Sequence, residues 1–285
     1  MRILVACDLT ARSDRALERG FRLARALGGE LRVLHVVDAA LPAALRQHAL
    51  DWAQENLGRE SDRLAALTGQ RAVVQVTAGD PGLDIARAAG GGAADLLVLG
   101  VHPGAGSALK PFAETTAGRI LRASLTAALL VSGEAAQPYC SVVVGVDYSM
   151  HARAAIRQAV QVAPGARLHL VHAFHAPFKT RLGAAGVVDE YAYAQRLEFD
   201  AFLREEMALL GQRAGELGVL PGNLETIIEE GPPAEVLRAV AARVGAELTV
   251  ISTHGRGVIS RAVWGSVAED LLGNPPGDVL VVKPF

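Results

Sequence analysis

The chain has 285 residues, of which 51% are hydrophobic and 20% are charged, and its formal net charge is −2. This is the composition of a globular protein, and it excludes an intrinsically disordered chain. The length is sufficient for two domains of ordinary size. The sequence has no basic run, which excludes a broad nucleic-acid-binding face, because binding to a phosphate backbone needs clustered Lys and Arg.

The apolar stretch before Asp8 is too short for a signal peptide or a membrane span. We therefore expect a cytoplasmic protein that does not associate with membranes. The two cysteines, Cys7 and Cys140, are too few for a disulfide framework. Cys7 falls in an apolar strand, where we expect it to act as a small buried hydrophobe.

The predicted elements of the first half return in the second half. An apolar strand from Arg2 ends at Asp8 and leads into a helix-like stretch, Ser13 to Leu27. A strand from Ser141 ends at Asp147 in the same way, and a helix follows it. A repeat this long indicates a duplicated domain, since solenoid repeats are typically about 20 to 50 residues. We expect two tandem domains, 1–137 and 138–285.

The spacing between the copies changes along the chain. It is 137 residues between His35 and His172 (172 minus 35), and 152 residues between Gly79 and Gly231 (231 minus 79). The second copy has therefore gained about 15 residues, which we assign to Lys179 to Tyr193. This insertion is interpreted either as a surface loop that covers a ligand or contacts a partner, or as a variable linker.

Strands and helices are predicted to alternate, which dictates an α/β fold: two tandem doubly wound domains, each a five-stranded parallel sheet flanked by helices. Such sheets bind ligands at the carboxyl ends of their strands. In the second half the strands are predicted at Val142–Val146, Leu168–Phe174, Leu224–Ile228, Glu247–Ile251 and Asp278–Lys283, and the helices at Arg153–Val162, Arg196–Leu217, Ala234–Val244 and Val258–Leu272.

A glycine-rich segment, Ser252 to Val267, follows the fourth strand of the second half. Glycines such as Gly255 let backbone N–H groups approach an anion, and Gly265-Ser266 adds a hydroxyl at the positive end of a helix. The segment is therefore a predicted phosphate cradle. It is not a P-loop, because it lacks Gly-Lys-Ser/Thr and follows strand four rather than strand one.

The acid after strand one and this segment resemble the universal stress protein family, whose nucleotide-binding members carry Gly-two residues-Gly-nine residues-Gly-Ser/Thr. Gly255 and Gly265-Ser266 fit that spacing, while Ser252 replaces the first glycine. The resemblance covers the chain twice. It implies a tandem universal stress protein whose two copies pair as an intramolecular pseudo-dimer. A further homodimer through exposed edge strands is left open.

The resemblance also implies a ligand, ATP or a related adenine nucleotide with Mg²⁺, bound in the second copy. Asp147 would contact adenine or ribose, and the backbone at Ala173 would face adenine, while phosphates would lie against Ser252, Gly255, Gly265 and Ser266, with His254 and Arg256 beside them. Other interpretations stay open: Asp147 as a helix cap, His254 as a turn residue and Arg256 as a surface charge.

The first copy departs from the motif. Pro103 stands in place of Gly255, which removes an N–H donor, and Ala113-Glu114 stands in place of Gly265-Ser266. A carboxylate beside a triphosphate costs on the order of 1 to 4 kcal/mol. We therefore predict that the first copy does not bind ATP in this manner.

The resulting hypothesis is a stress-response protein that binds ATP in its second domain and signals occupancy to an unidentified protein partner. The alternatives are a scaffold that binds no nucleotide and a very slow ATP hydrolase. No catalytic residue is assigned, since no Gly-x-Ser-x-Gly elbow or activated nucleophile is found. His169, His172 and His175 have no Cys, Asp or Glu at ligand spacing, so no protein metal site is predicted.

Overall fold

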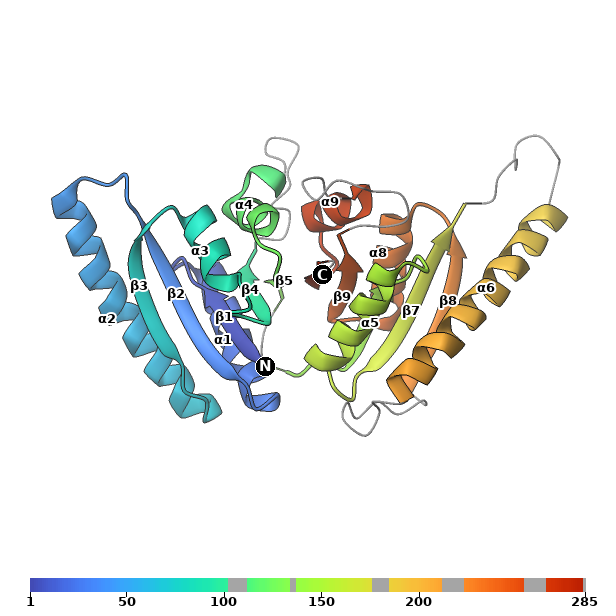
Figure 1. Cartoon of the computed structure of the whole chain (residues 1–285), viewed down its shortest axis with the longest axis horizontal. Coiled ribbons are helices and arrows are strands. Elements are labelled where there is room, and N and C mark those ends of the chain that lie inside the picture. Colours follow the sequence, from blue (N-terminus) through green and yellow to red (C-terminus); the bar gives the residue numbers. More distant parts are fainter. Residues whose placement is uncertain (102–111, 134–136, 176–184, 212–222, 254–264, 284–285) are drawn as a thin grey trace. The chain divides into compact units, whose positions relative to one another are not determined.

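The computed structural model describes residues 1–101, 112–133, 137–175, 185–211, 223–253 and 265–283. Strands and helices alternate along both halves of the chain (Figure 1). The chain divides into two compact units. The first unit contains Met1–Pro138 and Leu272–Lys283, and the second contains Tyr139–Leu271. The expected α/β class, with parallel sheets flanked by helices, is confirmed.

The first unit contains a parallel sheet and one further, antiparallel strand. Its elements are β1 (Arg2–Ala6), α1 (Ala11–Ala26), β2 (Glu30–Asp38), α2 (Ala43–Thr68), β3 (Val73–Gly79), α3 (Pro81–Ala89), β4 (Leu96–Gly100), the 3₁₀ turn η1 (Phe112–Glu114), α4 (Thr116–Ala123), β5 (Ala127–Val131) and β10 (Asp278–Val282). The strand order is β3-β2-β1-β4-β5, all parallel. β10, expected as the fifth strand of the second half, runs antiparallel to β5 and is counted in this unit.

The second unit repeats the pattern. Its elements are β6 (Ser141–Gly145), α5 (Met150–Val162), β7 (Arg167–Phe174), α6 (Ala185–Gly211), β8 (Leu224–Glu230), α8 (Pro233–Val244), β9 (Leu248–Ser252) and the beginning of α9 (Ser266–Gly273). The strand order is β9-β6-β7-β8, again parallel. The carboxyl ends of these strands therefore meet at one edge, which is where the candidate site lies.

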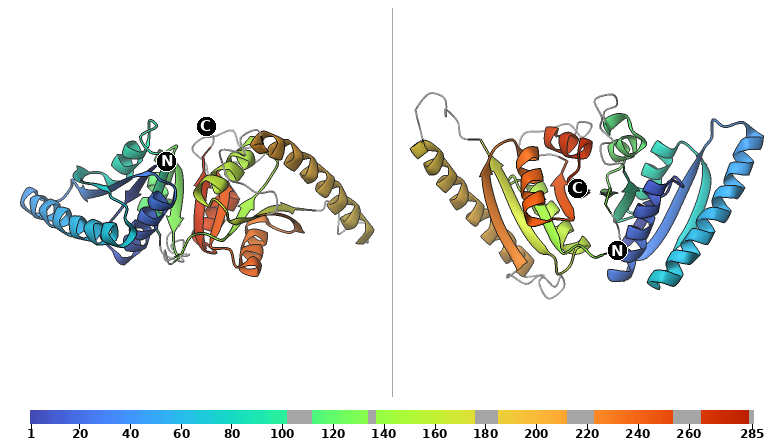
Figure 2. Two further views of the ribbon diagram at one scale, coloured as in Figure 1. Left: turned by 90° about the horizontal axis from the view of Figure 1, so that it is seen from below. Right: turned by 180° about the vertical axis from the view of Figure 1, so that it is seen from behind.

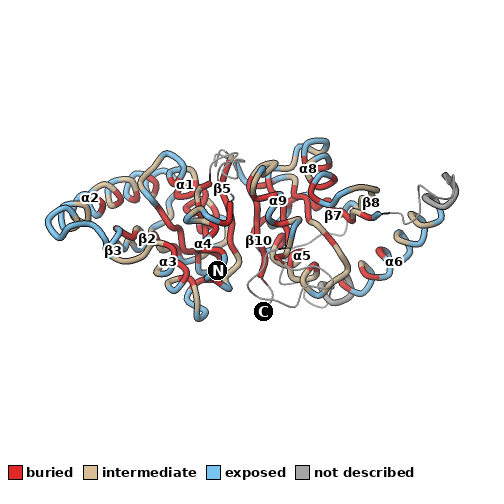
Figure 3. Tube along the Cα trace, turned by 90° about the horizontal axis from the view of Figure 1, so that it is seen from above, coloured by how far each residue is buried: buried red, intermediate tan, exposed pale blue. Residues whose placement is uncertain are grey.

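Helices cover both faces of each sheet, as Figure 2 shows. In the first unit α1 contacts α2, and α3 contacts α4. The central strands are continuous apolar runs because both of their faces are covered. Val142, Val143 and Val144 of β6 are all 0% exposed. Figure 3 shows the same contrast between buried strands and the exposed outer turns of the helices.

The largest differences from the predicted boundaries are at the starts of three helices. α5 begins at Met150 rather than Arg153, because the Ser149 Oγ accepts a hydrogen bond from the Ala152 N–H at 3.2 Å and caps the helix. α6 begins at Ala185, so that the described part of the predicted surface insertion is helical. The last helix was predicted to begin at Val258, whereas α9 begins at Ser266, so that Gly265 lies outside it.

Among the helices of the described residues, none is long and apolar enough to cross a bilayer.

Candidate functional site

The acid that follows β6 lies in a tight turn at the start of α5. Asp147 Oδ1 accepts hydrogen bonds from the Ser149 N–H at 3.1 Å and the Ser149 hydroxyl at 2.6 Å. Between them, Tyr148 has φ 62°, a left-handed conformation that is uncommon for a residue other than glycine. The capping role considered for Asp147 thus belongs to Ser149, and the carboxylate holds the capping serine in place.

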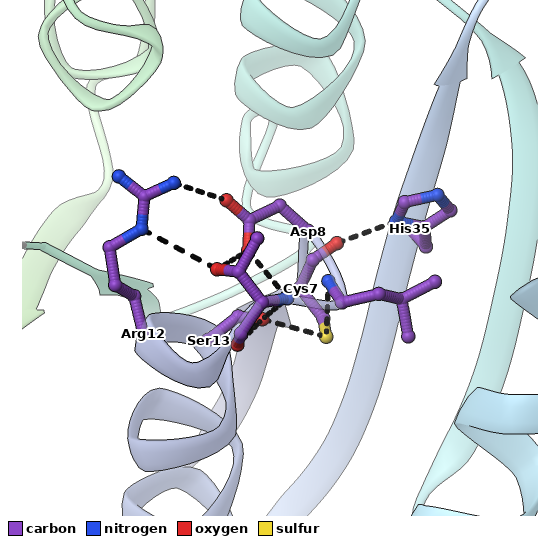
Figure 4. Close-up of polar contacts among 7 residues, drawn as sticks. Cys7, Asp8, Arg12, Ser13 and His35 are labelled. Atoms are coloured by element: carbon purple, nitrogen blue, oxygen red, sulfur yellow. Dashed lines mark hydrogen bonds and ion pairs between the residues drawn. The ribbon is translucent and has the colours of Figure 1, made fainter.

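The first unit contains the same turn, and Figure 4 shows it with its neighbours. Asp8 Oδ1 accepts a hydrogen bond from the Thr10 N–H at 3.1 Å, and Leu9 has φ 59°. Here an arginine joins the turn: Arg12 Nη2 lies 3.4 Å from Asp8 Oδ2. Part of the negative charge at this edge is therefore balanced by the chain itself.

A histidine on the second strand of each unit supports the end of the first strand. His35 Nδ1 lies 2.8 Å from the Cys7 carbonyl, and His172 Nδ1 lies 2.8 Å from the Val146 carbonyl. Because a carbonyl oxygen can only accept, each Nδ1 carries a hydrogen. His172 has a second contact, 3.0 Å from its Nε2 to Gln195 Oε1 on α6. This contact ties the strand edge to the helix that contains the end of the insertion.

A cavity of about 300 Å³ opens beside this edge in the second unit. Asp147, Ala173, Ser252, Gly265 and Ser266 all line it, although they come from four separate segments. Ser252 and Ala173 are half-buried, and Ser266 is exposed. The remaining predicted residues, His254, Gly255 and Arg256, lie outside the part of the chain that the structure describes.

The walls of the cavity include residues that sequence reasoning missed. Val146, Leu237 and Ile251 are buried apolar residues that give it a hydrophobic wall. A Cβ added at Gly145 would lie 3.3 Å from Leu237 Cδ1, so the glycine allows α8 to approach β6. Thr253 also lines the cavity, and it could have been found as the neighbour of Ser252. Nothing in the sequence marks Leu237 in this way, because the apolar spacing around it is that of any helix with one buried face.

Another wall is formed by the first turn of α9. The Gly265 N–H donates to the Thr253 carbonyl at 3.1 Å, and a Cβ at position 265 would lie 3.3 Å from that same oxygen. Ser266, Val267 and Ala268 follow and line the cavity. The first N–H groups of a helix lack intrahelical partners and lie at the positive end of its dipole. This wall can therefore stabilise an anion.

The corresponding segment of the first unit is built differently. Phe112 and Ala113 are buried in η1, and Glu114 is exposed. Helix α4 starts after this turn, and the Thr115 hydroxyl accepts a hydrogen bond from the Gly118 N–H at 3.0 Å. One donor of the helix N-terminus is thus already satisfied, and a carboxylate stands where the second unit has the Ser266 hydroxyl.

The histidines of β7 take part in packing. Among the described residues, no group of three or more His, Cys, Asp or Glu could hold a metal ion. His169 Nδ1 lies 3.1 Å from Glu225 Oε2, at the distance of an ion pair but without the geometry of a hydrogen bond. Burial lowers the pKa of His169, which favours its neutral form.

Comparison with known proteins gives consistent matches. A family model described as the universal stress protein family matches residues 1–132 and 138–283. A universal stress protein of Thermus aquaticus is 32% identical over 146 residues, which cover 50% of this chain and 98% of that protein. The crystal structure of a universal stress protein from Archaeoglobus fulgidus has a TM-score of 0.71 at 22% identity and covers 99% of this chain and 98% of that one. A functionally unknown Pseudomonas aeruginosa protein has a TM-score of 0.60 at 22% identity, with 99% and 92% covered.

Proposed function

The chain belongs to the universal stress protein family, and from this premise we propose that its second unit binds ATP and thereby regulates a protein partner. The observation that carries the proposal is the cavity beside Asp147. Residues assigned by sequence to adenine, ribose and phosphate line it together, although they are up to 119 positions apart (266 minus 147). The family resemblance supplies the identity of the nucleotide.

The chemistry of the walls supports a nucleotide. The cavity volume of about 300 Å³ is at the lower end of ligand pockets, which hold roughly 300–1,000 Å³. The apolar wall at Leu237 and Ile251 would pack against the base, and the Ala173 backbone would offer it hydrogen bonds. The Ser266 hydroxyl and the first N–H groups of α9 would hold phosphate oxygens.

Mg²⁺ fits the same arrangement as a companion of the phosphates. Proteins usually bind Mg²⁺ through one or two carboxylates together with substrate phosphates. Asp147 is the carboxylate that lines the cavity. Once bound, the ion would reduce the repulsion between the phosphate charges and this carboxylate, which keeps its hydrogen bonds to Ser149.

Regulation would follow from a shift in populations. ATP can stabilise one arrangement of the second unit only by its differential affinity for that arrangement, and a partner would then recognise it. The rival function is a scaffold without nucleotide, which is favoured by Ser252, because its side chain adds a Cβ where the motif has glycine. Pairing of the two copies within a chain remains a prediction. Pairing of two chains is also a prediction, which light scattering coupled to size exclusion would test through the molar mass.

The duplicated turn provides a matched pair of variants. Asp147→Ala and Asp8→Ala remove equivalent carboxylates and equivalent hydrogen bonds to the following Ser149 or Thr10. Calorimetric titration with MgATP should show binding weakened about tenfold or more in Asp147→Ala and unchanged in Asp8→Ala. Equal affinities in both variants would contradict the assignment of the site. If the wild-type protein binds no MgATP, the scaffold without nucleotide is the remaining function.

A further inference from the structure

A second cavity, of about 410 Å³, lies in the first unit between α1 and α2. It is separate from the proposed nucleotide site, which belongs to the second unit. Its floor contains the buried apolar side chains of Cys7, Leu17 and Leu57. Its rim carries Asp14 from α1 and, from α2, Trp52, Asn56, Arg59, Glu60 and Arg63. The cavity thus combines an apolar floor with a rim that carries charges of both signs and one large aromatic ring.

In the second unit, the place that corresponds to this cavity is filled by side chains. Tyr148, which occupies the turn position of Leu9, has its ring centroid 5.6 Å from Phe199 and 5.8 Å from Phe202. Arg153, at the position of Asp14 (153 minus 139), lies 4.6 Å above the Phe202 ring and pairs with carboxylates of α6. The second copy therefore has aromatic rings and a paired arginine where the first has an open cavity and a carboxylate.

Both arginines of the rim already have acidic partners: Arg63 pairs with Glu60, and Arg59 Nη2 lies 3.6 Å from Glu55 Oε1. Within the described part of the chain, no group donates a hydrogen bond to the Asp14 carboxylate or forms an ion pair with it. Partial burial raises the pKa of Asp14, and the nearby Glu60 and Asp8 carboxylates raise it further, against a smaller opposing effect of Arg63. Arg63 is already engaged with Glu60, at 2.6 Å from Nη2 to Oε1. A bound cation would therefore be attracted at Asp14.

The indole of Trp52 adds a second attraction for a cation. This side chain is 51% exposed although it is large and apolar. Aromatic faces attract ammonium groups, and Trp does so most strongly. We propose that the cavity binds a small organic ammonium ion, with its charged nitrogen between Asp14 and Trp52 and its alkyl chain on the floor formed by Leu17 and Leu57.

The probe for this proposal is n-butylammonium, with 1-butanol as a neutral molecule of the same size and shape and butyrate as an anion. In a Trp264→Phe background, Trp52 is the remaining tryptophan and its fluorescence reports on the cavity. A saturable change is expected with n-butylammonium, and neither control molecule should produce it at the same concentration. An equal response to 1-butanol would overturn the proposal, because the charge would then have no role.

Variants separate binding from stability. Asp14→Asn should weaken n-butylammonium binding about tenfold, whereas Asp62→Asn, an exposed acid of α2 that does not line the cavity, should leave it unchanged. Leu9→Tyr copies the filled arrangement of the second unit on a turn with nearly the same φ, 59° against 62°. It should abolish binding while the melting temperature is retained or raised. Unchanged binding in Asp14→Asn or in a folded Leu9→Tyr would refute the site.

Discussion

Arg19, in the first helix of the chain, forms a buried ion pair with Asp278 in the last strand. Arg19 Nε lies 3.4 Å from Asp278 Oδ2, and the two side chains are 5% and 1% exposed. Asp278 Oδ1 also accepts hydrogen bonds from the N–H groups of Ser132 and Gly133, both at 2.9 Å. Arg19 Nη1 donates to the Gln137 carbonyl at 2.6 Å. One buried carboxylate thus connects α1, β10 and the segment that follows β5.

Removal of that carboxylate should be costly. Asp278→Ala leaves the Arg19 guanidinium buried beside an empty position, and breaking a buried pair in this way typically costs about 3–5 kcal/mol. Urea denaturation, followed by circular dichroism, measures the loss in the free energy of unfolding. The matched control is Asp270→Ala, whose partner Arg238 lies at 2.9 Å and whose side chain is 58% exposed. That variant should cost about 1 kcal/mol or less, and equal losses would contradict the importance of the buried pair.

The buried Lys283 should make the stability of the fold depend on pH. Its Nζ donates to the Leu121 carbonyl at 2.5 Å, and burial lowers its pKa from 10.5 to about 8. Below pH 8 both folded and unfolded states bind the proton, so the full cost of burying the charge is present. Between pH 8 and 10.5 the folded state releases the proton while the unfolded state keeps it, and stability rises with pH.

The shift of about 2.5 pKa units corresponds to roughly 3 kcal/mol. We expect the free energy of unfolding of the wild type to gain about 2 kcal/mol of this, relative to Lys283→Met, as the pH rises from 8 to 10. Parallel urea titrations of the two proteins at several pH values provide the measurement. If both proteins show the same pH dependence in this range, then Lys283 does not titrate as described.

Tyr148 should stabilise the second unit by filling the space between α5 and α6. Tyr148→Leu removes its ring contacts with Phe199 and Phe202 and the hydrogen bond from its hydroxyl to the Gln195 carbonyl at 3.2 Å. We expect a loss of about 2–3 kcal/mol in the free energy of unfolding. Leu9→Tyr in the first unit is the reciprocal variant and should cost nothing. Thermal unfolding of both variants is the measurement. If Tyr148→Leu is as stable as the wild type, then the space between α5 and α6 closes without the tyrosine ring, and the prediction is wrong.

Local sequence patterns predicted most of the fold, because buried parallel strands have a distinctive apolar run. β7 was predicted from Leu168 to Phe174 and is observed one residue longer, from Arg167. The start of α6 was not predictable in the same way. Its first residues include Gly186, which is a poor helix former, and the helix there is supported by packing such as Tyr191 against Phe174, with ring centroids 5.7 Å apart.

The candidate site was predictable in part for the same reason. Asp147 and Ser266 are marked by a strand end and by a motif, both of which are local. The wall at Leu237, the antiparallel pairing of β10 with β5 and the cavity beneath Trp52 depend on which helices and strands meet. Such features arise from side-chain volumes on segments far apart in the chain, which no local pattern records.

The central claim, that the second unit binds ATP against the start of α9, is tested most directly by Ser266→Glu. This variant copies Glu114 of the first unit, and an acid at the first position of a helix favours its dipole, so the fold should persist. Nucleotide released from the denatured wild type is identified by chromatography, and MgATP is then titrated into both emptied proteins. We predict a single ATP per wild-type chain and loss of binding in Ser266→Glu. Undiminished binding in the folded variant, or a wild type that binds no nucleotide, would contradict the account.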